Sequence, residues 1–80
     1  MARVNRFYPD KRDSRSHPTE VDCGWQVVIA PDGTRLLQLS TYGSDTRVSR
    51  KKGVSQTLQL DRRNAQELIK ILQDNLGVSR

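Results

Sequence analysis

The chain has 80 residues, which suffices for one domain with a thin core, since a domain of this size buries only about 60% of the surface that its unfolded chain exposes. Its 14 lysines and arginines outnumber its 9 acidic residues, and the net charge of +5 favours a polyanionic partner, most simply nucleic acid. A lone cysteine excludes an internal disulfide. The sequence shows neither a signal peptide nor an apolar run long enough to span a bilayer, so we expect a cytoplasmic protein with no membrane partner.

Residues 1–19 are expected to form a flexible basic arm, and residues 20–80 a single folded domain. The arm has two prolines, mixed charges and no periodic apolar pattern, so it cannot bury enough apolar surface to offset its ordering entropy. Two interpretations stay open: a solvated tail, or an arm that follows phosphates through Arg3, Arg6, Lys11, Arg12 and Arg15. The sequence also leaves open whether the arm adds a fourth strand.

Two alternating segments, Glu20–Ala30 and Arg35–Tyr42, predict a β-hairpin. Between them, Pro31-Asp32-Gly33 predicts a turn in which the proline presets the first position and the glycine takes a left-handed conformation. This loop pairs Ala30 with Thr34. The resulting register places Trp25 opposite Leu39 and Val27 opposite Leu37.

A third strand, Val54–Leu60, is predicted to run directly into a helix. Asp61 occupies the N-cap position and Gly77 the C-terminal cap position. Between them lies one apolar stripe at helical spacing: Ala65, Leu68, Ile69, Leu72 and Leu76.

The predicted fold class is α+β: an antiparallel β-meander of three to four strands followed by one amphipathic helix, which packs on one sheet face. The face expected to carry the core holds Trp25, Val27, Leu37, Leu39, Thr41, Val54, Leu58 and Leu60. The opposite, open face is expected to present mainly uncharged polar groups, namely Gln26, Gln38, Ser40, Tyr42, Ser55, Thr57 and Gln59, together with the apolar Val28 and Leu36.

Catalytic and metal-binding patterns are sparse in this sequence. His17 is the only histidine, and a pairing with Asp13 or Glu20 as base and orienting group would need order in a segment that has little reason to be ordered. Cys23 falls on the predicted apolar face, and no cysteine–histidine cluster has metal-ligand spacing. We therefore expect no enzyme, cofactor, metal or small-molecule substrate.

A polar sheet face bordered by basic residues is typical of proteins that bind single-stranded nucleic acid. The candidate site residues combine phosphate-binding cations, a ring that can stack on bases and amides that can hydrogen-bond: Arg35, Arg47, Arg50, Lys51, Lys52, Tyr42, Gln38 and Gln59. The same composition suits a merely solvated face or a protein interface. Trp25 is expected to pack in the core.

The segment KKGVSQTLQLDRRNAQELIKIL resembles the strand-into-helix ending of the PC4-like single-stranded-DNA-binding proteins. The matching residues are Lys52, Gly53, Val54, Leu58, Leu60, Leu68, Ile69 and Leu72, and the resemblance covers about residues 21–76 at the level of pattern. It implies a strongly curved antiparallel sheet, a dimer mediated by the helix, and DNA held by basic and aromatic residues of the sheet and loops.

The segments HPTEV (residues 17–21) and LQLSTYGSD (residues 37–45) resemble a group of small actinobacterial and phage-associated proteins that are often labelled methionyl-tRNA formyltransferase. The chain is too short for that enzyme, and the sequence contains no folate or formyl-transfer site. This resemblance implies a bacterial or phage protein and carries no mechanism.

The leading hypothesis is therefore a non-enzymatic nucleic-acid-binding protein that prefers single strands and forms a homodimer. The alternative is a small protein–protein interaction module of bacterial or phage origin with no nucleic-acid role.

Overall fold

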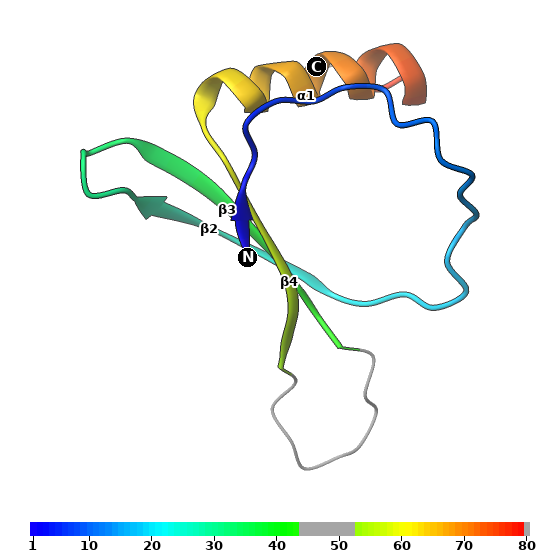
Figure 1. Cartoon of the computed structure of the whole chain (residues 1–80), viewed down its shortest axis with the longest axis horizontal. Coiled ribbons are helices and arrows are strands. Elements are labelled where there is room, and N and C mark those ends of the chain that lie inside the picture. Colours follow the sequence, from blue (N-terminus) through cyan, green and yellow to red (C-terminus); the bar gives the residue numbers. More distant parts are fainter. Residues whose placement is uncertain (44–52, 80) are drawn as a thin grey trace.

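A computed structural model of the protein describes residues 1–43 and 53–79 (Figure 1). Four strands precede one helix in the order β1 (Ala2–Arg3), β2 (Cys23–Ile29), β3 (Arg35–Tyr42), β4 (Val54–Leu60) and α1 (Arg62–Leu76). The fold is α+β, as the sequence predicts, and α1 packs against the sheet.

The sheet is mixed, with the strand order β1-β4-β3-β2. Strands β2, β3 and β4 form the predicted antiparallel meander, but β1 pairs with β4 in parallel. The expectation of a wholly antiparallel sheet is therefore wrong at this edge. The fourth strand comes from the segment that the sequence describes as an arm, and Val4 N extends the pairing by donating to the Gln59 carbonyl oxygen at 2.9 Å.

The β2–β3 hairpin has the predicted register. Trp25 pairs with Leu39 and Val27 with Leu37. The turn closes through the Ala30 N–H, which donates to the Thr34 carbonyl at 2.8 Å, and Gly33 has a φ of 90°. The positive φ explains why glycine stands at this position, because a Cβ disfavours that conformation.

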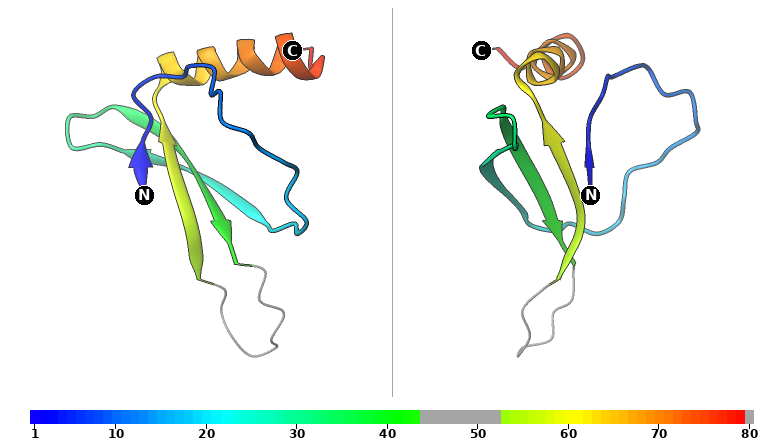
Figure 2. Two further views of the ribbon diagram at one scale, coloured as in Figure 1. Left: turned by 45° about the vertical axis from the view of Figure 1, so that its right-hand side comes forward. Right: turned by 60° about the vertical axis from the view of Figure 1, so that its left-hand side comes forward.

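Helix α1 begins and ends where its caps predict. The Asp61 carboxylate accepts a hydrogen bond from the Asn64 N–H at 2.9 Å, and Gly77 ends the helix with a φ of 68°. Only Asp61 separates β4 from α1. The helix consequently lies across the end of the sheet instead of folding back over its face (Figures 1 and 2).

The placement of the helix overturns one expectation about the core. Trp25 is 72% exposed, and Val27 and Leu58 on the same face are also exposed. Among the described residues, the buried hydrophobic side chains are Leu36, which the sequence assigns to the open face, and Leu60. The prediction that α1 covers the face of Trp25 is wrong because the one-residue connection does not let the helix turn back along that face.

Candidate functional site

The polar face of the sheet consists of Gln26, Gln38, Ser40, Tyr42, Thr57 and Gln59. The sequence also assigns Ser55 to this face, which is wrong: the β3–β4 pairing shifts between Thr41 and Tyr42, so Val54 pairs with Tyr42, and the Ser55 hydroxyl lies 2.8 Å from that of Thr41 on the other face. The β3–β4 register brings the central residues of the polar face together in two cross-strand pairs. Gln59 Nε2 donates to Gln38 Oε1 at 2.8 Å, and the hydroxyls of Ser40 and Thr57 lie 3.2 Å apart. The structure thus joins Gln38 and Gln59, which the sequence proposes as separate hydrogen-bonding groups.

The centre of the polar face is less open than the sequence predicts. Ser40 and Thr57 are buried, whereas Gln26 is exposed. Burial is tolerated because each hydroxyl finds its partner on the neighbouring strand. Gln38 and Gln59 are half-buried, and their mutual hydrogen bond uses only one polar atom of each amide, so the pair can still offer one donor group and one acceptor.

Tyr42 lies at the end of β3, near Gly24 on the adjacent strand. A Cβ built on Gly24 would lie 3.5 Å from the Tyr42 ring, which is ordinary van der Waals contact, so the ring lies close against this position of β2. Tyr42 itself is half-buried. The Tyr42 ring therefore lies near the backbone of Gly24 and remains partly accessible to solvent.

Residues 43–53 connect β3 to β4 and include the predicted phosphate-binding cations; we call this segment the basic loop. It begins at the Tyr42 end of the sheet. Gly43 N donates to the Gly53 carbonyl at 3.2 Å, which brings the two ends of the loop together next to Tyr42 and Val54. The predicted phosphate-binding residues Arg47, Arg50, Lys51 and Lys52 lie outside the described residues.

Arg35 does not join this group. It opens β3, whereas Tyr42 closes the same strand, so roughly 23 Å of extended chain separates them. Arg35 pairs with Ile29 and lies on the exposed apolar side, where it lines a shallow cavity together with Arg62. The structure thus places Arg35 at the far end of the sheet and on the other face.

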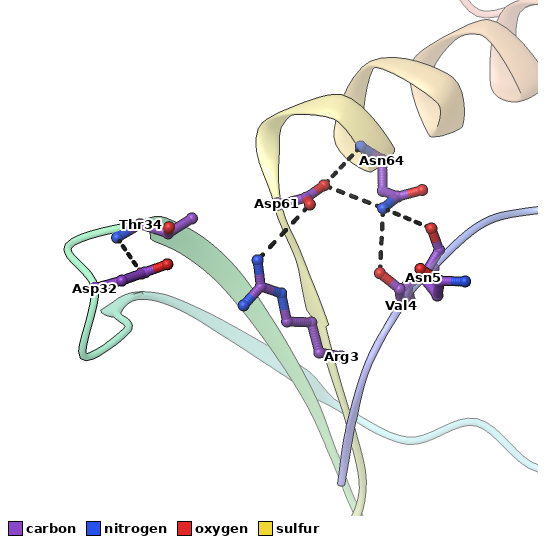
Figure 3. A network of polar contacts seen from close by, with 7 residues as sticks. All are labelled: Arg3, Val4, Asn5, Asp32, Thr34, Asp61 and Asn64. Atoms are coloured by element: carbon purple, nitrogen blue, oxygen red, sulfur yellow. Dashed lines mark hydrogen bonds and ion pairs between the residues drawn. The ribbon is translucent and has the colours of Figure 1, made fainter.

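Arg3 is a cation that the sequence does not assign to the sheet. It pairs with Gln59 and therefore shares the polar face, at the end opposite Tyr42. Its guanidinium lies 3.8 Å from the Asp61 carboxylate, and the side chain is 46% exposed (Figure 3). No local pattern reveals this position, because two residues pair in parallel with a strand more than fifty residues later.

Asn64 holds the N-terminal segment in place. It is 2% exposed, and its Nδ2 donates to the carbonyl oxygens of Val4 at 3.1 Å and Asn5 at 3.3 Å, and to Asp61 Oδ1 at 3.1 Å (Figure 3). The position of Arg3 is thus determined by the first turn of α1.

Two carboxylates near this network have lowered pKa values. The backbone N–H of Asn64 is the main cause for Asp61, and Arg3 contributes further to holding its pKa below the usual range. For Asp32, hydrogen bonds from the side chain and backbone of Thr34 lower the pKa, with a smaller contribution from Arg3. Both carboxylates are therefore ionised at neutral pH, and Asp61, which pairs with Arg3, partly balances its charge.

His17 has neither Asp13 nor Glu20 as its hydrogen-bonding partner. Its Nδ1 lies 3.0 Å from the Thr19 hydroxyl, on an exposed part of the chain. Among residues 1–43 and 53–79, no group of three histidine, cysteine or acidic side chains is placed to hold a metal ion. In the same part of the chain, α1 is neither long nor apolar enough to cross a membrane.

The chain is thus an α+β domain with a four-stranded mixed sheet, one polar face and one exposed apolar face. Comparisons with protein-family models, with curated proteins and with solved structures find no match for this chain.

Proposed function

We propose that this protein is a non-enzymatic nucleic-acid-binding protein that prefers single strands. The observation that carries the proposal is the half-buried amide pair Gln38–Gln59 on a polar face with Arg3 at one end and Tyr42 at the other. The net charge of +5 supports an anionic partner.

The residues of the polar face suit the chemistry of an unpaired base. An amide pair can donate and accept at once, as the edges of bases do, and it adds no fixed charge. Tyr42 offers a ring on which a base can stack, and Arg3 can hold a phosphate. Stacking and edge contacts of this kind need bases that are not already paired within a duplex, which favours single strands.

The basic loop is the second part of the proposed site. Its sequence places Arg50, Lys51 and Lys52 directly before Gly53. The Gly53 carbonyl accepts a hydrogen bond from the N–H of Gly43, the residue after Tyr42. We propose that these cations, with Arg47, bind phosphates of a strand whose bases contact the polar face. Binding should then weaken steeply as salt rises, because each phosphate contact releases counterions.

Fluorescence anisotropy with a labelled single-stranded oligonucleotide tests the proposal. The wild-type protein should bind with a dissociation constant below about 100 μM at low salt, a level comparable with generic non-specific binding. Reversing the charges of Arg50, Lys51 and Lys52 to glutamate should abolish this binding. The matched control reverses Arg62, Arg63 and Lys70 on α1, which changes the net charge equally, and should weaken binding much less.

The role of Tyr42 has its own test. Tyr42→Ala should weaken binding about 10- to 100-fold, in line with the ~1–3 kcal/mol that stacking contributes for each base, whereas Tyr42→Phe keeps the ring and should bind almost as the wild type does. Oligonucleotide binding that is absent, or is insensitive to salt, contradicts the proposed function.

The alternative function is that of a protein–protein interaction module. The exposed apolar side chains around Trp25 favour it, because interfaces are enriched in tryptophan. The loop variant separates the two functions, since it should leave docking through the apolar face intact while abolishing nucleic-acid binding.

A further inference from the structure

The face opposite the polar face is apolar and uncovered in the single chain. We call it the open apolar face and define it by Trp25, Val27, Ile29 and Leu58, which are 72%, 46%, 55% and 47% exposed. The register places these residues on one side of the sheet. Exposure of so large a ring among aliphatic neighbours is unusual for a surface that faces only water.

Helix α1 carries a second uncovered apolar surface. Ile69 is 52% exposed and Leu76 is 72% exposed, while Ala65, Leu68 and Leu72 on the same stripe are half-buried. A shallow cavity connects the two surfaces; it is lined by Val27 and Leu37 from the sheet and Ala65 from the helix, and also by the charged Arg35, Asp61 and Arg62. The open apolar face and the helix stripe therefore form one mainly apolar region, which runs from the sheet face onto the helix at the end of the sheet.

The size of this region fits a protein interface. Its six exposed residues are Trp25, Val27, Ile29, Leu58, Ile69 and Leu76. Their exposed parts amount to roughly 700 Å² of mainly apolar surface, close to the ~800 Å² that each partner contributes to a standard stable interface. A typical monomer exposes no apolar patch larger than a few hundred Å².

Two observations indicate that a second copy of this chain covers the region. Leu36 and Leu60 are the only buried hydrophobic residues among residues 1–43 and 53–79, so the single chain has little core of its own. None of the six residues is charged, and Asp61 lies beside Arg35 and Arg62 at the cavity that joins the two surfaces, so the charges that border the region are of both signs.

We propose that two copies associate around a two-fold axis, with the open apolar face of one protomer covering the α1 stripe of its partner. In a symmetric dimer each such contact occurs twice, so a surface built from one sheet face and one helix stripe is complementary to itself. The inference rests on exposed apolar area and does not depend on nucleic-acid binding.

Sedimentation equilibrium in about 1 M salt tests the dimer, because charge-mediated contacts are screened at a Debye length of ~3 Å while apolar contacts persist. The wild-type chain should be dimeric at about 100 μM and dissociate on dilution. Val27→Lys buries a charge in the interface and should raise the dissociation constant at least about 100-fold. Its matched control is Gln26→Lys, which puts the same charge on the neighbouring exposed residue of the opposite face and should leave the dimer unchanged.

Trp25 gives a measurement that needs no variant, because it is the only tryptophan of the chain. Its emission should lie at short wavelength in the dimer and shift to long wavelength as dilution separates the protomers. A wild-type chain that is monomeric at about 100 μM, with the emission of a water-exposed indole, overturns the proposal. Equal dimer affinity of Val27→Lys and Gln26→Lys overturns it as well.

Discussion

The side-chain nitrogen Nδ2 of Asn64, in the first turn of α1, donates to the carbonyl oxygen of Val4 at 3.1 Å. Val4 lies sixty residues earlier in the chain. This contact and its neighbour to Asn5 tie the N-terminal segment to the helix and keep β1 beside β4. The helix start is thus both a cap for α1 and the anchor of the sheet edge.

Asn64→Ala should destabilise the protein by about 1–3 kcal/mol, because the carbonyl oxygens of Val4 and Asn5 lose a buried donor. Thermal unfolding at a fixed protein concentration measures the loss. The control is Asn75→Ala, which removes an exposed hydrogen bond to the Ile71 carbonyl and should cost less than about 0.5 kcal/mol. Equal losses in the two variants would contradict the anchoring role of Asn64.

Asp61 should make the stability depend on pH in the acid range. Its pKa is lowered in the folded protein, chiefly by the Asn64 N–H. Near pH 4 the folded protein therefore binds fewer protons at this carboxyl than the unfolded chain does. The contribution is fully present above the unfolded pKa of about 3.9 and is lost as the pH falls through the folded pKa.

Asp61→Asn removes this dependence while keeping a side-chain oxygen that can accept from the Asn64 N–H. Urea unfolding between about pH 6 and pH 2 should show that the wild type is more stable at the upper end and that the two proteins converge at the lower end. A constant difference across the whole range would show that the carboxylate charge plays no part.

The hydroxyls of Ser40 and Thr57 should be strongly coupled. Ser40→Ala or Thr57→Val alone leaves the other hydroxyl buried without its partner and should cost about 1–3 kcal/mol. The double variant should cost less than the sum, with a coupling energy of about 0.5–3 kcal/mol in a double-mutant cycle. Additive losses would mean that the pair is not a mutual hydrogen bond.

Gly33→Ala should destabilise the hairpin by about 1–2 kcal/mol, because the turn requires a φ of 90° while no neighbouring atom blocks an added Cβ. Gly53→Ala is the control, since Gly53 is also sterically open and lacks a positive φ. That substitution should be neutral or slightly stabilising, by up to about 1 kcal/mol. Differential scanning calorimetry compares the two, and a loss at both positions would point to packing instead of backbone conformation.

Much of the fold could be predicted because its signals are local. The hairpin register follows from the Pro31–Gly33 turn, and the helix limits follow from Asp61 and Gly77. In each case residues a few positions apart determine the backbone, and their preferences do not depend on what packs against them.

The candidate site was less predictable from the sequence. Alternation correctly groups Gln38 with Gln59, but it fails at the start of β4, where the irregular pairing puts Val54 opposite Tyr42 and the Ser55 hydroxyl beside Thr41. It does not reveal that the pair hydrogen-bonds, that Arg3 lies beside it, or that Arg35 points to the other face at the far end. These are relations between distant segments, which periodicity does not encode.

The sequence alone determines three antiparallel strands, the register of the β2–β3 hairpin, and a capped amphipathic helix, since turn chemistry and hydrophobic period act over a few residues. Only the tertiary structure decided which face the helix leaves open. Alternation marks the side of Trp25 as apolar, and from this the sequence predicts a core there. The single residue between β4 and α1 holds the helix at the end of the sheet, so that face stays exposed in the single chain. Which side of a sheet is covered depends on where the connection lets the helix lie, and residue patterns on the strands carry no information about that position.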